Sequence, residues 1–129
     1  MLNQQELTIR VRYAETDAMG FLHHSNYFVY FEMGRTELFR AQGGNYRDME
    51  SKGLFLVVVK IECNFKSPAR YDDELTLKTR ISRITPAKLE HEYEVRRGGE
   101  LLTTAKSTLA CIDKNGRIQR MDEVVPGIE

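Results

Sequence analysis

The sequence has no excess of charge of either sign and no long apolar segment. Its 129 residues include 19 Lys and Arg and 19 Asp and Glu, so the formal net charge is zero and no general affinity for nucleic acid or anionic membranes is expected. No apolar run approaches the roughly 20 residues that a membrane-spanning helix needs. The first residues, Met1 to Glu6, also lack the basic and then apolar pattern of a signal peptide. We therefore expect a cytoplasmic protein with no transmembrane segment.

Cysteine and proline are scarce, with two cysteines and three prolines in the whole chain. Cys63 and Cys111 stand in apolar or strand-like surroundings and form no CxxC pair, which favours buried free thiols over a disulfide. There is no repeat, low-complexity stretch or proline-rich linker. The chain is therefore expected to form one domain over residues 1–129, long enough to have a core of its own.

Common catalytic and nucleotide-binding motifs are also absent. There is no GxSxG nucleophile elbow, no Walker loop and no GxGxxG fingerprint, so serine hydrolase, nucleotidase and dehydrogenase functions have no support. The three histidines, His23, His24 and His91, show no HxxxH or cysteine spacing. No metal site is therefore expected.

One long helix is predicted over residues 25–42. Its aromatic residues favour a strand locally, but its apolar residues recur at the helical period, which favours a helix of about 17 residues. Ser25 or Asn26 is the expected N-cap, and Gly43-Gly44 is the expected end. Gly34 inside the helix costs about 1 kcal/mol relative to alanine, which indicates the close approach of another backbone there.

Alternating apolar and polar residues predict strands in most of the remaining chain. The first strand covers residues 7–14 and has Leu7, Ile9, Val11 and Tyr13 on one face. After residue 53 the chain is predicted as strands and turns, with strands at 54–65, 75–84, 89–95 and 101–113. These elements predict an α+β fold in which one long central helix is wrapped by a curved antiparallel sheet of about five long strands. Strands of this length leave exposed edges that pairing between subunits would satisfy.

The segment from Arg10 to Tyr27 places Asp17 in a glycine-containing turn seven residues before His24, where the helix is expected to begin. A carboxylate can act as a base or nucleophile, and the N–H groups at a helix start can stabilise a negatively charged oxygen. This arrangement therefore suits hydrolysis of an acyl group. On the residues alone, however, an aspartate in a Thr-Asp-x-x-Gly turn is more often a turn former than a catalytic group.

The same segment resembles the 4-hydroxybenzoyl-CoA thioesterase family of the hotdog fold. The match lies in Arg10-Val11, Thr16-Asp17, Gly20, His24 and Tyr27. A second stretch, Phe65 to Asp73, resembles the family's central Pro-Ala-x-x-x-Asp turn. Within the family, the chain is most similar to the bacterial short-chain acyl-CoA thioesterase branch associated with the Tol-Pal system.

This resemblance implies an acyl-CoA thioesterase that needs no cofactor apart from the coenzyme A of its substrate. Asp17 would attack the thioester carbonyl or activate a water molecule for that attack. A backbone N–H at the helix start, that of His24 or a neighbour, would hold the carbonyl oxygen. Sites of this family form at subunit interfaces, so the resemblance also implies a homo-oligomer, either a dimer or a dimer of dimers (a homotetramer).

Further residues are candidates for binding the acyl-CoA. Phe21 and Tyr27, together with the apolar run Leu54–Val59, suggest an apolar pocket for a short aliphatic or an aromatic acyl group. Phe21, Leu22 and His23 depart from the family pattern, so the choice of acyl group is expected to depend on them. Lys66 and Arg70 are the candidates for binding the coenzyme A phosphates. Two other basic groups are alternatives: Arg80 with Arg83 and Lys88, and Arg96 with Arg97.

Several alternatives stay open at this point. The His24 imidazole could be essential, or only its backbone N–H could act. Glu32 could reach the site as a helix-borne acid, or it could form an ordinary ion pair, and the same holds for Glu37. The fold also suits a hydratase or dehydratase, a thioesterase acting on acyl carrier protein, or a non-catalytic acyl-CoA-binding module.

Overall fold

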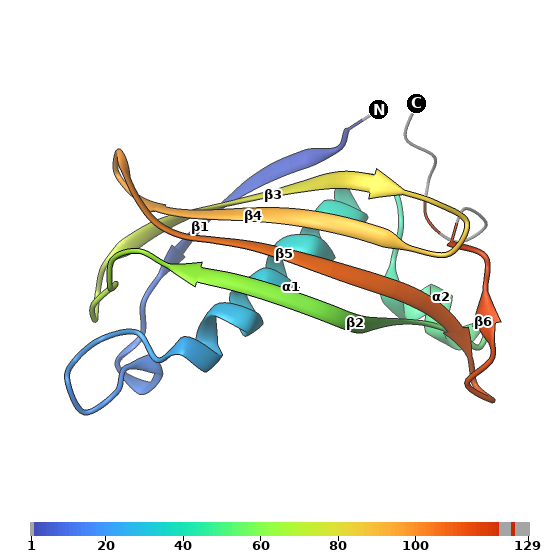
Figure 1. Ribbon diagram of the computed structural model, residues 1–129, viewed down its shortest axis with the longest axis horizontal. Coiled ribbons are helices and arrows are strands. Elements are labelled where there is room, and N and C mark those ends of the chain that lie inside the picture. Colours follow the sequence, from blue (N-terminus) through green and yellow to red (C-terminus); the bar gives the residue numbers. More distant parts are fainter. Residues whose placement is uncertain (1, 122–124, 126–129) are drawn as a thin grey trace.

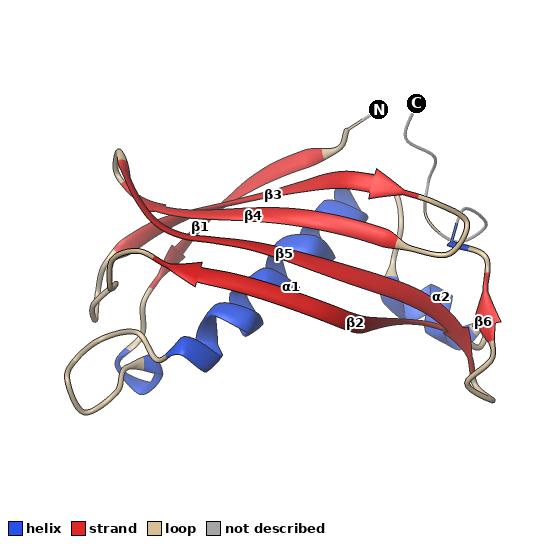
Figure 2. Cartoon of the chain, in the orientation of Figure 1, coloured by secondary structure: helices blue, strands red, loops and turns tan. Residues whose placement is uncertain are grey.

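One long helix lies against a curved antiparallel sheet that wraps around it (Figure 1). The computed structural model describes residues 2–121 and residue 125. The strands are β1 (Gln4–Arg10), β2 (Leu54–Phe65), β3 (Glu74–Ile84), β4 (Leu89–Arg97), β5 (Glu100–Asp113) and the two-residue β6 (Ile118–Gln119). The helices, blue in Figure 2, are the 3-10 helix η1 (Tyr13–Glu15), α1 (His24–Ala41) and α2 (Tyr46–Ser51). The long strands follow the order β1-β3-β4-β5-β2, and β6 pairs with the end of β5.

This architecture confirms the predicted α+β fold with one long helix and about five long strands. α1 begins and ends one residue before its predicted bounds. Sequence analysis does not predict α2 or β6, because six and two residues are too few to show a period. α2 depends instead on Asn45, whose side chain accepts hydrogen bonds from the N–H groups of Arg47 and Asp48. Within the described residues, no helix combines the length and the hydropathy needed to cross a membrane.

β1 ends at Arg10, earlier than predicted, because Val11 pairs with the loop that precedes β3. The N–H of Val11 donates to the carbonyl of Asp73, and the carbonyl of Val11 accepts from the N–H of Asp72, both at 2.9 Å. The chain then turns into η1. The prediction that Tyr13 shares a strand face with Ile9 and Val11 is therefore wrong, since Tyr13 lies in η1 and is 77% exposed. Ile9 and Val11 are buried as predicted.

The main core lies between α1 and the sheet. Phe31 of α1 stacks on Tyr93 of β4, with ring centroids 4.5 Å apart. Burying a side chain of this size contributes about 1.5–3 kcal/mol, so this layer supplies much of the stability. Alternate residues of β3 and β4 are buried, as their pattern predicts: Leu75, Leu77, Thr79, Ile81, Leu89, His91, Tyr93 and Val95.

Gly34 packs tightly against β3. A Cβ atom added at Gly34 would lie 2.2 Å from Oγ1 of Thr79 and 2.9 Å from Cδ2 of Leu77. The close approach at Gly34 is therefore made by side chains of β3, and glycine is tolerated inside the helix because a side chain has no room there.

Cys63 of β2 and Cys111 of β5 are free thiols, as predicted. Cys111 is buried and Cys63 is partly buried. Burial raises the pKa of both thiols, and raises that of Cys63 to about 11. Both sulfurs therefore stay protonated at neutral pH, which makes them poor nucleophiles.

Candidate active site

An open cavity of about 380 Å³ lies where the start of α1 meets the end of β2 and the loop that follows it. Most of the predicted site residues line this cavity: Asp17, Phe21, His24, Tyr27 and Lys66. Arg70 lies next to it, with its guanidinium carbon 4.6 Å from the centre of the Phe21 ring. The rest of the lining consists of Leu22, Phe65, Ser67 and Pro68.

Asp17 is fixed by its own turn. Its N–H donates to the carbonyl of Phe21 at 2.8 Å, and its carbonyl accepts from the N–H of Gly20 at 3.0 Å. Oδ1 of the carboxylate accepts from the N–H groups of Met19, at 2.9 Å, and Phe21, at 3.1 Å. Within the described residues no hydrogen bond goes to Oδ2. Asp17 is thus a turn former through one oxygen, while the other is left for a partner from outside the chain.

The N-cap of α1 is His23, so the prediction of Ser25 or Asn26 is wrong. Ser25 lies inside the first turn, and its N–H donates to Nδ1 of the His23 ring at 3.2 Å. The side chain of Asn26 does not cap the helix, because its Nδ2 donates to the carbonyl of Glu15 at 3.1 Å. Histidine therefore occupies a position where short polar residues are the common choice.

The cap leaves one N–H free at the helix start. The N–H of His23 donates to the carbonyl of Glu15 at 2.9 Å, and that of Asn26 to the carbonyl of His23 at 3.0 Å. The N–H of Ser25 is taken by the His23 ring. Among the described residues the N–H of His24 has no acceptor, and His24 lines the cavity beside Asp17. The helix start therefore offers one free donor, on a residue that lines the same cavity as Asp17.

Glu15, which sequence analysis does not identify, joins this segment to α1. Its buried carboxylate accepts from the N–H of Arg12 at 2.8 Å, from the hydroxyl of Tyr30 at 2.7 Å and from the Arg12 guanidinium at 3.1 Å. Burial alone would raise the pKa of Glu15, but these hydrogen bonds together outweigh burial, so the pKa lies below its usual value. No period in the sequence marks this residue, because its burial depends on contacts with α1.

The wall of the cavity is aromatic. Tyr27 and Phe65 meet edge to face with ring centroids 5.2 Å apart. Burial raises the pKa of the Tyr27 hydroxyl, so this group stays protonated. Sequence analysis assigns Leu54–Val59 to the pocket, but none of these residues lines the cavity. They occupy the opposite end of the 12-residue strand β2 from Phe65, which takes their place.

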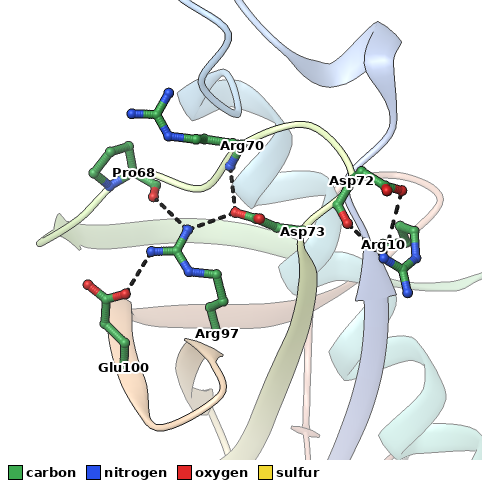
Figure 3. Close-up of polar contacts among 7 residues, drawn as sticks. All are labelled: Arg10, Pro68, Arg70, Asp72, Asp73, Arg97 and Glu100. Atoms are coloured by element: carbon green, nitrogen blue, oxygen red, sulfur yellow. Dashed lines mark hydrogen bonds and ion pairs between the residues drawn. The ribbon is translucent and has the colours of Figure 1, made fainter.

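The loop between β2 and β3 forms the other side of the cavity and is held by ion pairs (Figure 3). The Arg97 guanidinium donates to Oδ2 of Asp73 at 2.7 Å and to the carboxylate of Glu100 at 2.7 Å. The same Asp73 oxygen accepts from the N–H of Arg70 at 2.8 Å. The loop in turn holds the Asp17 turn, because the carbonyl of Ala69 accepts from the N–H of Leu22 at 2.8 Å.

Ion pairs also distinguish the candidate phosphate-binding residues that are already paired from those that are not. Lys66 and Arg70 have no carboxylate partner among the described residues, and both stand at the cavity. Arg97 is paired as described above, Arg80 pairs with Glu92, and Arg96 lies 3.6 Å from Glu94. Arg83 and Lys88 lie around the β3–β4 turn, at the other end of the sheet from the start of α1 (Figure 1).

The remaining histidine and the helix-borne acids lie away from the Asp17 cavity. Glu32 lines a separate hollow of about 210 Å³ together with Arg35 and Tyr46. Glu37 forms an ion pair with Arg40 on the surface of α1. His91 is buried, and burial together with the nearby Arg35 lowers its pKa to about 3, so this ring is neutral at physiological pH.

Comparison with known proteins identifies the family of the chain. Residues 11–127 match the family model of the thioesterase-like superfamily. YneP of Bacillus subtilis (strain 168), provisionally named an acyl-CoA thioesterase, is 41% identical over 107 residues, which cover 82% of this chain and 78% of that protein. The acyl-CoA thioester hydrolase YbgC of Escherichia coli O6:H1 is 30% identical over 106 residues, covering 81% and 79%. The solved structure of a DHNA-CoA thioesterase from Staphylococcus aureus is 32% identical and aligns with a TM-score of 0.90 over 95% of this chain and 84% of that chain.

We predict that Asp73→Asn destabilises the protein by about 1 kcal/mol at neutral pH, because the ion pair with Arg97 is lost. Burial would raise the pKa of Asp73, but the hydrogen bonds from Arg70 and Arg97 outweigh burial and lower it. A lowered folded-state pKa stabilises the fold above the unfolded-state pKa of about 3.9, and this stabilisation is lost as the pH falls through the folded-state pKa.

Urea titrations should therefore show the full difference between wild type and Asp73→Asn at about pH 7, and a smaller difference at an acidic pH below the folded-state pKa of Asp73. Asp48→Asn removes an exposed carboxylate from α2 and serves as the matched control. A difference that is the same at both pH values would contradict the ion-pair explanation.

Proposed function

The chain belongs to the thioesterase-like superfamily and has the hotdog fold, and from this premise we propose that it hydrolyses an acyl-CoA to the free acid and coenzyme A in the Asp17 cavity. One observation carries the proposal. The Asp17 carboxylate shares the cavity with His24, whose N–H is the donor at the helix start that has no acceptor among the described residues. A base or nucleophile and an oxyanion donor are the two groups that acyl transfer requires.

The two groups act on opposite ends of the carbonyl bond. The thioester carbonyl oxygen accepts a hydrogen bond from the N–H of His24. The positive end of the α1 dipole stabilises the negative charge that develops on this oxygen. One such donor lowers the barrier by about 3 kcal/mol. Asp17 either attacks the carbonyl carbon or takes a proton from the water that attacks. The carbon–sulfur bond then breaks, and the coenzyme A sulfur leaves and takes up a proton that comes from the water consumed in the reaction. If Asp17 is the nucleophile, this break leaves a mixed anhydride on Asp17, which water then hydrolyses to the free acid and the Asp17 carboxylate.

The cavity wall suits a small or flat acyl group. Phe21, Tyr27 and Phe65 present aromatic faces and edges to a space of about 380 Å³, at the lower end of the range for ligand pockets. We propose a short aliphatic or an aromatic acyl group as substrate, and the Staphylococcus aureus relative is named for an aromatic acyl-CoA. The placement in the Tol-Pal-associated branch and in the cytoplasm stays a prediction.

The alternative of a hydratase or dehydratase has no structural support, because it needs a histidine and a helix-borne acid in one site. Glu32 faces a different hollow from His24. The alternatives of an acyl carrier protein substrate and of a non-catalytic acyl-CoA-binding module are separated by the assays below.

Lys66 and Arg70 are proposed to bind the phosphates of coenzyme A. Both are exposed cations at the cavity and lack a carboxylate partner among the described residues. Arg70 is positioned for this role by its N–H bond to Asp73 and by the contact of its guanidinium with the Phe21 ring. A guanidinium and an ammonium on one rim can bind two phosphate groups by charge-assisted hydrogen bonds.

The homo-oligomer is proposed to form along β2. This 12-residue strand is an edge of the sheet, and no strand of the described residues pairs with its outer side. Val58 and Val59, at its bulge, are 45% and 56% exposed. An unpaired strand with exposed apolar residues favours pairing with another chain, so we propose a dimer through β2, or a dimer of such dimers.

We predict that Asp17→Asn lowers kcat by about 10²–10⁴, because the amide cannot act as base or nucleophile. The amide oxygen can still accept from the N–H groups of Met19 and Phe21, so the turn should persist. Thiol release from acyl-CoA and acyl carrier protein thioesters would be followed for wild type, Asp17→Asn and the control Asp48→Asn. Equal rates for wild type and Asp17→Asn would remove Asp17 from catalysis. Tight coenzyme A binding without hydrolysis of any thioester would indicate the binding module.

We predict that the double variant Lys66→Gln/Arg70→Gln raises KM for an acyl-CoA by about tenfold, because two phosphate contacts are lost. KM for the matching acyl-pantetheine, which has no nucleotide phosphates, should not change. Arg83→Gln/Lys88→Gln makes the same change of charge at the far end of the sheet and is the control. A rise of equal size with both substrates would contradict phosphate binding.

We predict that light scattering gives a mass of two or four times the 15.0 kDa of the chain. Val58→Lys should shift this mass towards one chain, because it places a charge at the proposed interface. Ile118→Lys, on β6 and also exposed, is the matched control. A monomeric wild type would refute the proposed assembly.

A further inference from the structure

We propose that the imidazole of His23 positions the free N–H of His24 and makes it sensitive to acid. Neutral His23 caps α1 and orders the helix start, whereas the protonated ring cannot act as the cap. His23 is thus a positioning residue for the reaction, and this inference rests on the proposed function of the Asp17 cavity.

The cap fixes the tautomer of the His23 ring. A backbone N–H can only donate, so the bond from the N–H of Ser25 to Nδ1, at 3.2 Å, requires an unprotonated Nδ1. The hydroxyl of Ser25 also lies 2.8 Å from Nδ1 and can donate to it. As the cap, the neutral ring therefore carries its proton on Nε2, and the two groups of Ser25 share the one lone pair of Nδ1.

The cap determines which donor stays free. Capping holds the Ser25 N–H on the His23 ring, while the N–H groups of His23 and Asn26 bind carbonyls. With these three fixed, the first turn is ordered and the N–H of His24 is left for the substrate. The usual cap residues Ser, Thr and Asn accept at every pH, whereas histidine changes charge in the physiological range.

Protonation of His23 would remove the cap in three ways. Nδ1 would become a donor and could no longer accept from Ser25. A positive charge would be placed at the positive end of the α1 dipole, which is unfavourable. The ring would also face the His24 ring, which stacks on it with centroids 4.2 Å apart and planes inclined by 29°. Two stacked rings cannot both be charged without repulsion, so acid loosens the helix start.

No carboxylate among the described residues forms an ion pair with His23 that would compensate this charge. On the preceding segment, the Glu15 carboxylate is taken by Arg12 and Tyr30, and Oδ1 of Asp17 is taken by its own turn. The segments around the cavity contribute these further titratable or charged groups: His24 on α1 and Lys66 and Arg70 on the loop after β2.

The first test compares the pH dependence of kcat in wild type and three variants. His23→Asn keeps an acceptor at every pH, and His23→Ala has none. The ratio of kcat at about pH 8 to kcat at about pH 5.5 should be about two- to tenfold smaller for His23→Asn than for wild type. His23→Ala should show low kcat even at about pH 8, with circular dichroism confirming that it is folded. His24→Asn keeps its backbone N–H and should retain the acid-side fall.

The second test does not depend on activity. Nitrogen-15 NMR of labelled wild type at about pH 8 should show the Nε2–H tautomer of His23, and the amide of Ser25 should shift with the same midpoint as that ring. A Nδ1–H tautomer, an insensitive Ser25 amide, or the same pH profile in His23→Asn and wild type would overturn the inference. Absence of hydrolysis at every pH would instead overturn the proposed function, while the NMR result would still decide whether His23 is the cap.

Discussion

The buried carboxylate of Glu15 is the contact on which the geometry of the candidate site depends. Its side chain ties η1 to Tyr30 in the middle of α1, and its carbonyl receives donors from His23 and Asn26 at the helix start. The Asp17 turn lies between these two attachments, so its position relative to α1 is set at both ends. A buried carboxylate is stable only where its hydrogen-bond partners are in place. The Glu15 contacts therefore stabilise this segment and also favour one conformation of it.

The elements that sequence analysis predicts well are those in which burial follows a regular period. The helical state of α1 and the buried faces of β3 and β4 follow from such a period. The close packing at Gly34 is predicted instead from the cost of glycine inside a helix. The end of β1 is missed because Val11 pairs with a loop some 60 residues further along the chain. The cap of α1 is missed because Asn26 is taken by the Glu15 carbonyl. Both depend on contacts between distant segments, which a local pattern does not contain.

The candidate site is predicted less from spacing than from the family resemblance. Spacing alone makes Asp17 a turn former, and the structure shows that role through Oδ1. The resemblance directs attention to the residues that the fold gathers around the cavity, but it does not predict the wall formed by Phe65. It also does not separate Lys66 from Arg97, because the ion pair of Arg97 with Asp73 forms only once β4 lies beside the loop. Contacts across the sheet therefore decide which cations remain free.

The contact between Phe21 and Arg70 limits how this enzyme can diverge. The backbones of the two residues pair, and the guanidinium of Arg70 covers the ring of Phe21. In the proposed site, the Phe21 ring belongs to the acyl wall and also supports the Arg70 cation at the rim. A substitution that reshapes the wall at Phe21 for a new acyl group would also release Arg70. If both residues have the proposed roles, acyl selectivity and affinity for coenzyme A are inherited together, and a lineage that changes one is expected to need a second, compensating substitution.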